Sequence, residues 1–338
     1  METNYFFQIV AVSNCASKRF INYLEEMFSG SKIHCFSEGE EAVKFINDSS
    51  IDTLYFSREN FTAFDFKSLI KNGNKKNFST ILQIKVNGDE EFVQLDKNFL
   101  IVNKTVMDGK TLDGYVESGI YFIPQELNSL FKINLFEGVI GIPLPVYSSS
   151  VEYFKSRPAL FLDRDGVINK DVAYLHEVKD IVIFDAIIPV IKFFNDKKLP
   201  VVVLTNQSGV ARGKFLESDV LKVNQHIFNY FIKKKVFIDR FYSCPYMESG
   251  EIEAYAKKTL NRKPSPGMLF QACGDFFIKL DGSFMIGDKI SDAIDVLGLT
   301  NISIQRNYDL AGAQHHVFSS ESEILAYIKA HCDYSAGP

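Results

Sequence analysis

Apolar residues in the second half of the chain gather in short runs that stop abruptly at small or charged residues. Such runs, bounded by turn-forming residues, are typical of strands buried within a parallel sheet. Because ligands of open α/β sheets bind at the carboxyl ends of the strands, the residues that follow each run are the candidates for chemistry. The runs cover residues 159–162, 201–204 and 284–286.

Carboxylates and hydrogen-bond donors follow these runs. Asp163 and Asp165 end the first run, Thr205 and Asn206 end the second, and Asp288 lies just beyond the third. An isolated Asp-x-Asp-Gly is equally compatible with a simple turn. Polar residues of this kind at three strand ends in one chain favour a functional site at the edge of the sheet.

Two cations and a further carboxylate complete the pattern. Arg262 and Lys263 lie just before a helix that Pro266 is expected to start. Asp292 lies four residues, about one helical turn, after Asp288. In this order the segments resemble the haloacid dehalogenase superfamily of phosphatases. The resemblance implies an α/β fold with a Rossmann-like parallel sheet and flanking helices.

The chemistry of phosphate monoesters explains these residue types. The ester is anionic, so a carboxylate attacks it only where a divalent cation and fixed positive charge offset the accumulating negative charge. The resemblance implies that Asp163 is the nucleophile and forms an aspartyl-phosphate. Asp165 would protonate the leaving group and then deprotonate the hydrolytic water. Thr205 and Lys263 would stabilise the transferring phosphoryl group.

The resemblance also implies a magnesium site. Mg²⁺ is a hard ion that prefers oxygen ligands. Asp163, Asp165 and Asp288 would hold it, and Asp292 would support these ligands from behind.

Two longer motifs narrow the resemblance. Residues 205–213 and 262–268 are similar to the D-glycero-D-manno-heptose 1,7-bisphosphate 7-phosphatases, relatives of the histidinol-phosphate phosphatases, and the likeness covers about residues 157–310. It implies that Asn206, Arg262 and Lys289 contact the substrate. Arg212 either joins them or is a solvated loop cation, since exposed arginines are common.

One loop departs from this family. Relatives carry a zinc-binding Cys-x-His and Cys-x-Cys before the arginine, a set of four ligands. Here Cys244 keeps the first position, whereas Tyr246, Thr259 and Asn261 occupy the other three. One thiolate does not make a structural zinc site, which needs four ligands. We therefore expect no zinc, and we expect the changed loop to affect the choice of substrate.

A change in composition near residues 145–158 predicts a boundary between domains covering residues 1–147 and 157–333. In the first domain, residues 6–12, 52–56 and 80–86 are expected to be strands. The order of these segments, and residues 112–122 above all, resembles a shortened sugar nucleotidyltransferase.

The first domain lacks the residues with which such enzymes bind the triphosphate and the metal. Residues 10–15 provide no glycine-rich, basic loop to hold a triphosphate, and Ser57-Arg58 stands where such enzymes have a metal-binding Gly-Asp. We interpret the first domain as a degenerate α/β domain, non-catalytic, for assembly or sugar binding. The alternative is a domain that contributes packing alone.

Composition is consistent with a cytoplasmic enzyme. The chain has 338 residues, five cysteines without a CxxC pair and a formal net charge of −5. The cysteine pattern favours a reducing compartment, and the negative charge argues against nucleic-acid binding. No apolar stretch of about 20 residues and no basic signal start occur, so we expect no membrane partner. A homo-oligomer or a pathway partner bound through the first domain is a further expectation.

Taken together, the residues predict a Mg²⁺-dependent phosphatase for a phosphorylated sugar, with heptose bisphosphate favoured. Histidinol phosphate or another small phosphomonoester is the alternative substrate. An alternative from another class is a sugar-phosphate-binding scaffold with a vestigial site.

We predict that the full-length chain transfers no nucleotidyl group from any nucleoside triphosphate to a sugar phosphate, because the first domain lacks the triphosphate loop and the metal-binding aspartate. Pyrophosphate release and sugar-nucleotide formation would be measured with each triphosphate in turn. Formation of any sugar nucleotide would contradict this interpretation.

Overall fold

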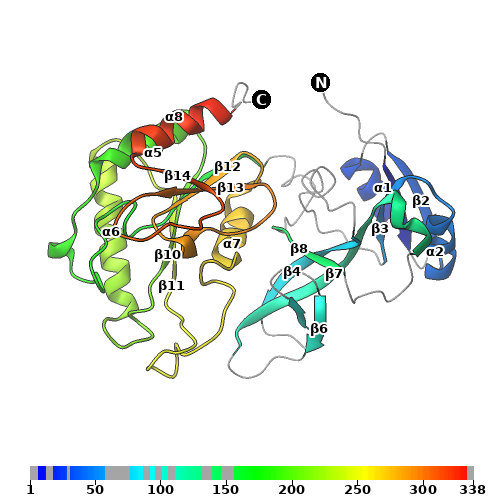
Figure 1. The fold of residues 1–338 in the computed structure, drawn as a ribbon, viewed down its shortest axis with the longest axis horizontal. Helices are drawn as coiled ribbons and strands as arrows, with labels where there is room; N and C mark the ends of the chain where they lie inside the picture. The colour runs from blue at the N-terminus through cyan, green and yellow to red at the C-terminus, as the bar shows by residue number, and fades with distance from the viewer. Residues whose placement is uncertain are drawn as a thin grey trace. The chain divides into compact units, whose positions relative to one another are not determined.

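The computed structural model describes residues 7–12, 18–28, 31–57, 77–86, 92–95, 101–105, 111–130, 139–145 and 156–332. The chain divides into two compact units (Figure 1). Unit 1 comprises residues 1–109 and 113–155, and unit 2 comprises residues 110–112 and 156–338. Residues 146–155, most of the predicted boundary segment, lie outside the described residues.

Unit 1 is built on a mixed sheet of eight strands with the order β2-β1-β3-β7-β4-β8, to which β5 and β6 add through β7. The three parallel strands β1, β2 and β3 meet the antiparallel pair β7 and β4 at β3. The predicted strands at 6–12, 52–56 and 80–86 correspond to β1, β3 and β4. Residues 13–15 and Arg58, which entered the comparison with nucleotidyltransferases, lie outside the described residues.

The elements of unit 1 are β1 (Phe7–Val12), α1 (Lys18–Met27), β2 (Lys32–Phe36), α2 (Gly39–Asn47), β3 (Asp52–Phe56), β4 (Ser79–Val86), β5 (Phe92–Leu95), β6 (Ile101–Thr105), β7 (Asp113–Ile123), the 3-10 helix η1 (Gln125–Leu130) and β8 (Ile140–Pro143).

Unit 2 contains a sheet of six parallel strands with the order β11-β10-β9-β12-β13-β14. Its elements are β9 (Leu160–Leu162), η2 (Val178–Asp180), η3 (Asp185–Ile187), α5 (Ile188–Asp196), β10 (Val201–Asn206), α6 (Glu217–Lys233), β11 (Arg240–Cys244), α7 (Gly267–Phe276), β12 (Ser283–Gly287), η4 (Ile290–Asp292), β13 (Leu299–Ile304), β14 (His316–Phe318) and α8 (Glu321–His331). The predicted parallel sheet with flanking helices is confirmed.

The three apolar runs form the middle of this sheet, because β9 lies between β10 and β12. Leu160 and Leu162 alternate with Phe161, so each strand buries residues on both faces. The face of Leu160 packs against α5, α6 and α8, whose core residues include Phe194, Ile227 and Ile324. The helix α7 contacts β10 and β11, and Figure 1 shows it across the sheet from α6.

Helix α7 begins where the sequence predicted, with Pro266 at its N-cap. No helix in the described part of the chain is long and apolar enough to cross a membrane. Since parallel strands bring their carboxyl ends to one edge, the polar residues after β9, β10 and β12 lie at the same edge of the sheet.

Candidate active site

The site begins at the carboxyl ends of the two central strands. Strand β9 ends at Leu162, and the amide of Asp163 donates a hydrogen bond of 2.8 Å to the carbonyl of Ile286 in β12. Strand β12 ends at Gly287, directly before Asp288. The ladder between the two strands therefore fixes the backbone that carries both aspartates.

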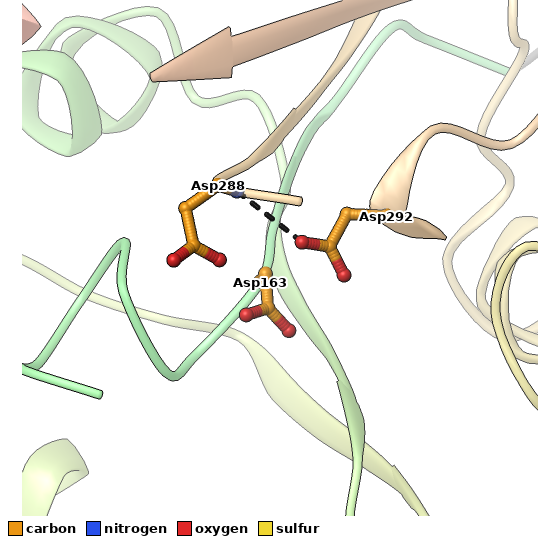
Figure 2. Close-up of side chains that lie close together, drawn as sticks. All are labelled: Asp163, Asp288 and Asp292. Atoms are coloured by element: carbon orange, nitrogen blue, oxygen red, sulfur yellow. Dashed lines mark hydrogen bonds between the residues drawn. The ribbon is translucent and has the colours of Figure 1, made fainter. Parts of the chain in front are cut away.

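Three buried carboxylates converge there. Figure 2 shows the side chains of Asp163, Asp288 and Asp292 directed toward a common space, and a carboxylate oxygen of each lies within 4.8 Å of the others. Like charges held this close, away from water, repel each other unless a cation compensates them. The Asp292 carboxylate, which we expected to lie behind the metal ligands, belongs to this cluster, and the Asp165 carboxylate lies outside it.

Asp288 carries the strongest sign of a metal site. Among the described residues, neither of its carboxylate oxygens has a hydrogen-bond partner, although both are buried. Burial raises the pKa of Asp288 to about 7. An unpartnered buried carboxylate beside two others is a donor set that fits a hard divalent cation such as Mg²⁺.

Lys263 lies against the other two carboxylates. Its fully buried ammonium group is 2.5 Å from Oδ1 of Asp163 and 2.8 Å from Oδ1 of Asp292. Burial lowers the pKa of Lys263, but the two carboxylates outweigh this and raise it above its usual value. Burial and Asp292 raise the pKa of Asp163, and Lys263 counteracts them. The ammonium group is thus the fixed positive charge of the site.

Both carboxylate oxygens of Asp292 have partners. Oδ1 contacts Lys263, whereas Oδ2 accepts hydrogen bonds from the amides of Asp288 at 3.2 Å and Lys289 at 3.0 Å. A Cβ atom added at Gly287 would lie 2.2 Å from the Cβ of Asp292, so only glycine permits this approach. Asp292 therefore orients Lys263 and the turn after β12.

Asp165 lies apart from this cluster in a network of its own. Arg164 contacts both of its oxygens, with Nη2 2.8 Å from Oδ2, and Asn169 and Gln207 each donate at 2.9 Å. Burial raises the pKa of Asp165, but the charge and hydrogen bonds of Arg164, with those of the two amides, lower it below the usual range. Asp165 is thus held ionised. Arg164, itself fully buried, reaches α6 through Asn224 at 3.0 Å.

The residues at the carboxyl end of β10 belong to the same site. Gln207 donates to Oγ1 of Thr205 at 2.8 Å as well as to Asp165, so one amide links the two. The side chain of Asn206 exchanges two hydrogen bonds of 3.0 Å with the backbone of Lys263. Asn206 thereby fixes Lys263, a contact that the sequence interpretation, which expected it to face the phosphate, did not include.

Gly166 explains how the first loop passes so close to Asp288. Its φ of +95° lies in the left-handed region, and an added Cβ would be 2.0 Å from Oδ2 of Asp288. Arg306 donates from Nε to the carbonyl of Gly166 at 3.1 Å and pairs with Glu321 of α8. A glycine is required here both by conformation and by space.

The three predicted substrate-binding cations differ in their surroundings. Among the described residues, the guanidinium of the half-buried Arg212 has no hydrogen bond or ion pair, and that of Arg262 only approaches the carbonyl of Tyr246 at 3.5 Å. Lys289 instead forms an ion pair of 2.8 Å with Asp171. Arg212 and Arg262 are thus uncompensated cations, whereas the charge of Lys289 is already paired.

The loop in which relatives carry zinc ligands is held here by aromatic and backbone contacts. Cys244 Sγ is 3.8 Å from the carbonyl of Tyr246, whose ring packs against Tyr255 with centroids 5.8 Å apart. The amides of Glu251 and Ile252 both donate to the carbonyl of Ala211. In the described residues, the three aspartates are the only set of three or more histidine, cysteine or acidic side chains close enough to share a metal ion. Among the described residues, this loop brings no such set of ligands together.

Part of the chain is similar in sequence to named phosphatases. The D-glycero-beta-D-manno-heptose-1,7-bisphosphate 7-phosphatase of Yersinia pestis is 37% identical over 138 residues, which are 41% of this chain and 73% of that protein. The chain belongs to the haloacid dehalogenase superfamily of phosphatases. The D-glycero-alpha-D-manno-heptose-1,7-bisphosphate 7-phosphatase of Campylobacter jejuni is 39% identical over 134 residues, 40% of this phosphatase and 73% of the relative.

A solved structure of a D,D-heptose 1,7-bisphosphate phosphatase from B. bronchiseptica, complexed with magnesium and phosphate, is also similar. It is 21% identical, with a TM-score of 0.45, over 52% of this chain and 100% of that one. No family model matches the chain.

Sequence reasoning passed over several residues that the structure brings to the site. Three of them, Arg164, Asn169 and Gln207, lie within or beside the motifs named above. One cation and two amides close to an acid in the sequence could have indicated that they contact Asp165. Asp171 and Tyr308 carried no such signal, because 137 positions of chain separate them.

We predict that the purified phosphatase contains no stoichiometric zinc and that Cys244→Ser changes activity and Tm little, because the loop is held by aromatic and backbone contacts instead of a metal. Elemental analysis of protein purified without chelator gives the first result, and steady-state kinetics and thermal unfolding of Cys244→Ser beside the wild-type protein give the second. One tightly held zinc per chain would contradict the prediction.

Proposed function

We propose that this protein removes the 7-phosphate of D-glycero-D-manno-heptose 1,7-bisphosphate, with Asp163 as the nucleophile. The single observation that carries the proposal is the buried cluster of Asp163, Asp288 and Asp292 around the ammonium group of Lys263. The two relatives described above act on the beta and alpha forms of this sugar according to their names, so the proposal covers both anomers.

In this proposal Asp163 attacks the phosphorus, the bond to the sugar oxygen breaks, and an aspartyl-phosphate forms. Lys263 and Thr205 hold the phosphoryl oxygens, and Asn206 keeps the backbone of Lys263 in place. Arg212, Arg262 and Lys289 contact the rest of the substrate. Water then cleaves the aspartyl-phosphate and releases phosphate.

Asp165 moves the proton in both halves of the reaction. The lowered pKa of Asp165 favours the ionised carboxylate, which is the state that accepts a proton from the hydrolytic water. To protonate the leaving group in the first half of the reaction, Asp165 must itself carry a proton. The negative charge of a bound phosphate monoester favours this state, since a like charge nearby raises the pKa of a carboxylate.

Mg²⁺ is the cation that we propose for the carboxylate cluster, with Asp163 and Asp288 as its side-chain ligands. When bound, it offsets negative charge on the phosphoryl group. Because Asp292 is engaged with Lys263 and with two backbone amides, we assign it to supporting the site. We propose that unit 1 is not catalytic.

We predict that Asp163→Asn lowers kcat by several orders of magnitude, as removal of a nucleophile does, while the protein stays folded. Phosphate release from heptose bisphosphate would be measured, and thermal unfolding would report the fold. Asp281→Asn is the matched control, since Asp281 is exposed and precedes β12, at the opposite end of that strand from Asp288. Substantial turnover by folded Asp163→Asn protein would refute the mechanism.

We also predict that a chelator abolishes activity and that Mg²⁺ restores it better than Ca²⁺, whose looser coordination holds an in-line geometry poorly. Asp288→Asn should raise the Mg²⁺ concentration needed for half-maximal activity, because it removes a carboxylate that accepts no hydrogen bond from any residue that the structure describes. Undiminished activity in chelator would rule out the metal.

A turnover screen separates the proposed substrate from the alternatives. Heptose bisphosphate, histidinol phosphate and simple hexose phosphates would be compared by kcat/KM under the same conditions. Histidinol phosphate and the hexose phosphates are included because the loop without the zinc ligands is expected to affect the choice of substrate. A higher kcat/KM for histidinol phosphate would overturn the substrate assignment and leave the phosphatase mechanism intact.

A further inference from the structure

Three residues from separate segments meet beside the carboxylate site. Lys289 follows Asp288, Asp171 lies in the loop after β9, and Tyr308 lies between β13 and β14. Oδ2 of Asp171 accepts from Nζ of Lys289 at 2.8 Å and from the hydroxyl of Tyr308 at 2.6 Å. The ammonium group also lies 4.5 Å from the centre of the Tyr308 ring. We call these residues the Lys289 cluster.

The two lysines near the site have different positions. The Lys263 side chain has no exposed surface and contacts Asp163, whereas the Lys289 side chain is 32% exposed and is drawn toward Asp171. The backbone of Lys289 is nevertheless fixed to the site, since its amide donates to Asp292. Lys289 is therefore at the rim, where it can reach a part of the substrate that does not react.

Tyr308 restrains the ammonium group in two ways. Its hydroxyl holds the carboxylate that pairs with Lys289, and its ring provides a cation–π contact. Tyr308 is itself anchored, because its carbonyl accepts from the side chain of Gln305 at 2.9 Å. A lysine held this way loses less rotamer freedom when a ligand binds, which favours binding.

We infer that Asp171 and Tyr308 are positioning residues that direct Lys289 toward the sugar portion of the substrate, and that this cluster contributes to substrate selectivity. The inference rests on the proposed function. With its charge paired to Asp171, Lys289 does not act as an isolated phosphate-binding cation. An ammonium donor, a carboxylate acceptor and a phenol side by side suit a ligand with several hydroxyl groups.

Tyr308→Phe tests the inference, because it removes the hydroxyl and keeps the ring. Steady-state kinetics would be measured with heptose bisphosphate and with p-nitrophenyl phosphate, which has no sugar. We expect KM for the sugar to rise about threefold to tenfold, the loss of one hydrogen bond, with kcat within about twofold. The ratio of kcat/KM for the sugar to that for p-nitrophenyl phosphate should fall by the same factor.

Two further variants complete the test. Tyr308→Leu removes the ring as well and should lower that ratio further. Tyr327→Phe is the matched control, since its hydroxyl contacts His316, on the edge strand, and not the site. It should leave the ratio at the wild-type value.

The outcomes separate the two claims. Suppose that wild-type protein hydrolyses heptose bisphosphate. If Tyr308→Phe then leaves the ratio unchanged, because kcat/KM stays the same or falls equally for the two substrates, the inference is overturned and the proposed function stands. If wild-type protein hydrolyses p-nitrophenyl phosphate but not heptose bisphosphate, the proposed substrate and the inference fall together.

Discussion

The site depends on one electrostatic constraint, the burial of three carboxylates at the end of two adjacent strands. Asp163, Asp288 and Asp292 are close enough to repel one another strongly in a medium of low dielectric constant. Lys263 compensates two of them, and within the described part of the chain the Asp288 carboxylate has no hydrogen-bond partner. The surrounding structure follows from this arrangement, including the glycines at 166 and 287 that let the backbone approach so closely.

Asp165 has surroundings opposite to those of the carboxylate cluster. Asp165 is two residues from Asp163, and alternate positions at the end of a strand face different directions. It is surrounded by donors, from Arg164, Asn169 and Gln207, instead of by other carboxylates. One short segment therefore carries two aspartates in contrasting environments, an arrangement that suits two different roles in catalysis.

The loop in which relatives carry zinc ligands is held here by a different set of contacts. Where relatives were expected to have zinc ligands, this chain holds its loop with the pair Tyr246 and Tyr255 and with hydrogen bonds to Ala211. These ring and backbone contacts restrain the loop that leads to Arg262. Arg212 and Arg262, whose guanidinium groups form no ion pair with any described residue, lie on the two segments that these contacts join.

The sequence by itself determined the parallel sheet of unit 2, the start of α7 and the identity of the strand-end residues. Short apolar runs, a proline and polar residues at run ends are local signals, and parallel strands bring such ends together. The nature of unit 1 stays a prediction. Only the tertiary structure decided which carboxylates share one space, that Asn206 holds the backbone of Lys263, and that Tyr308 reaches Asp171. The reason is physical: direction and pairing of side chains depend on how distant segments pack, and 137 positions separate Asp171 from Tyr308.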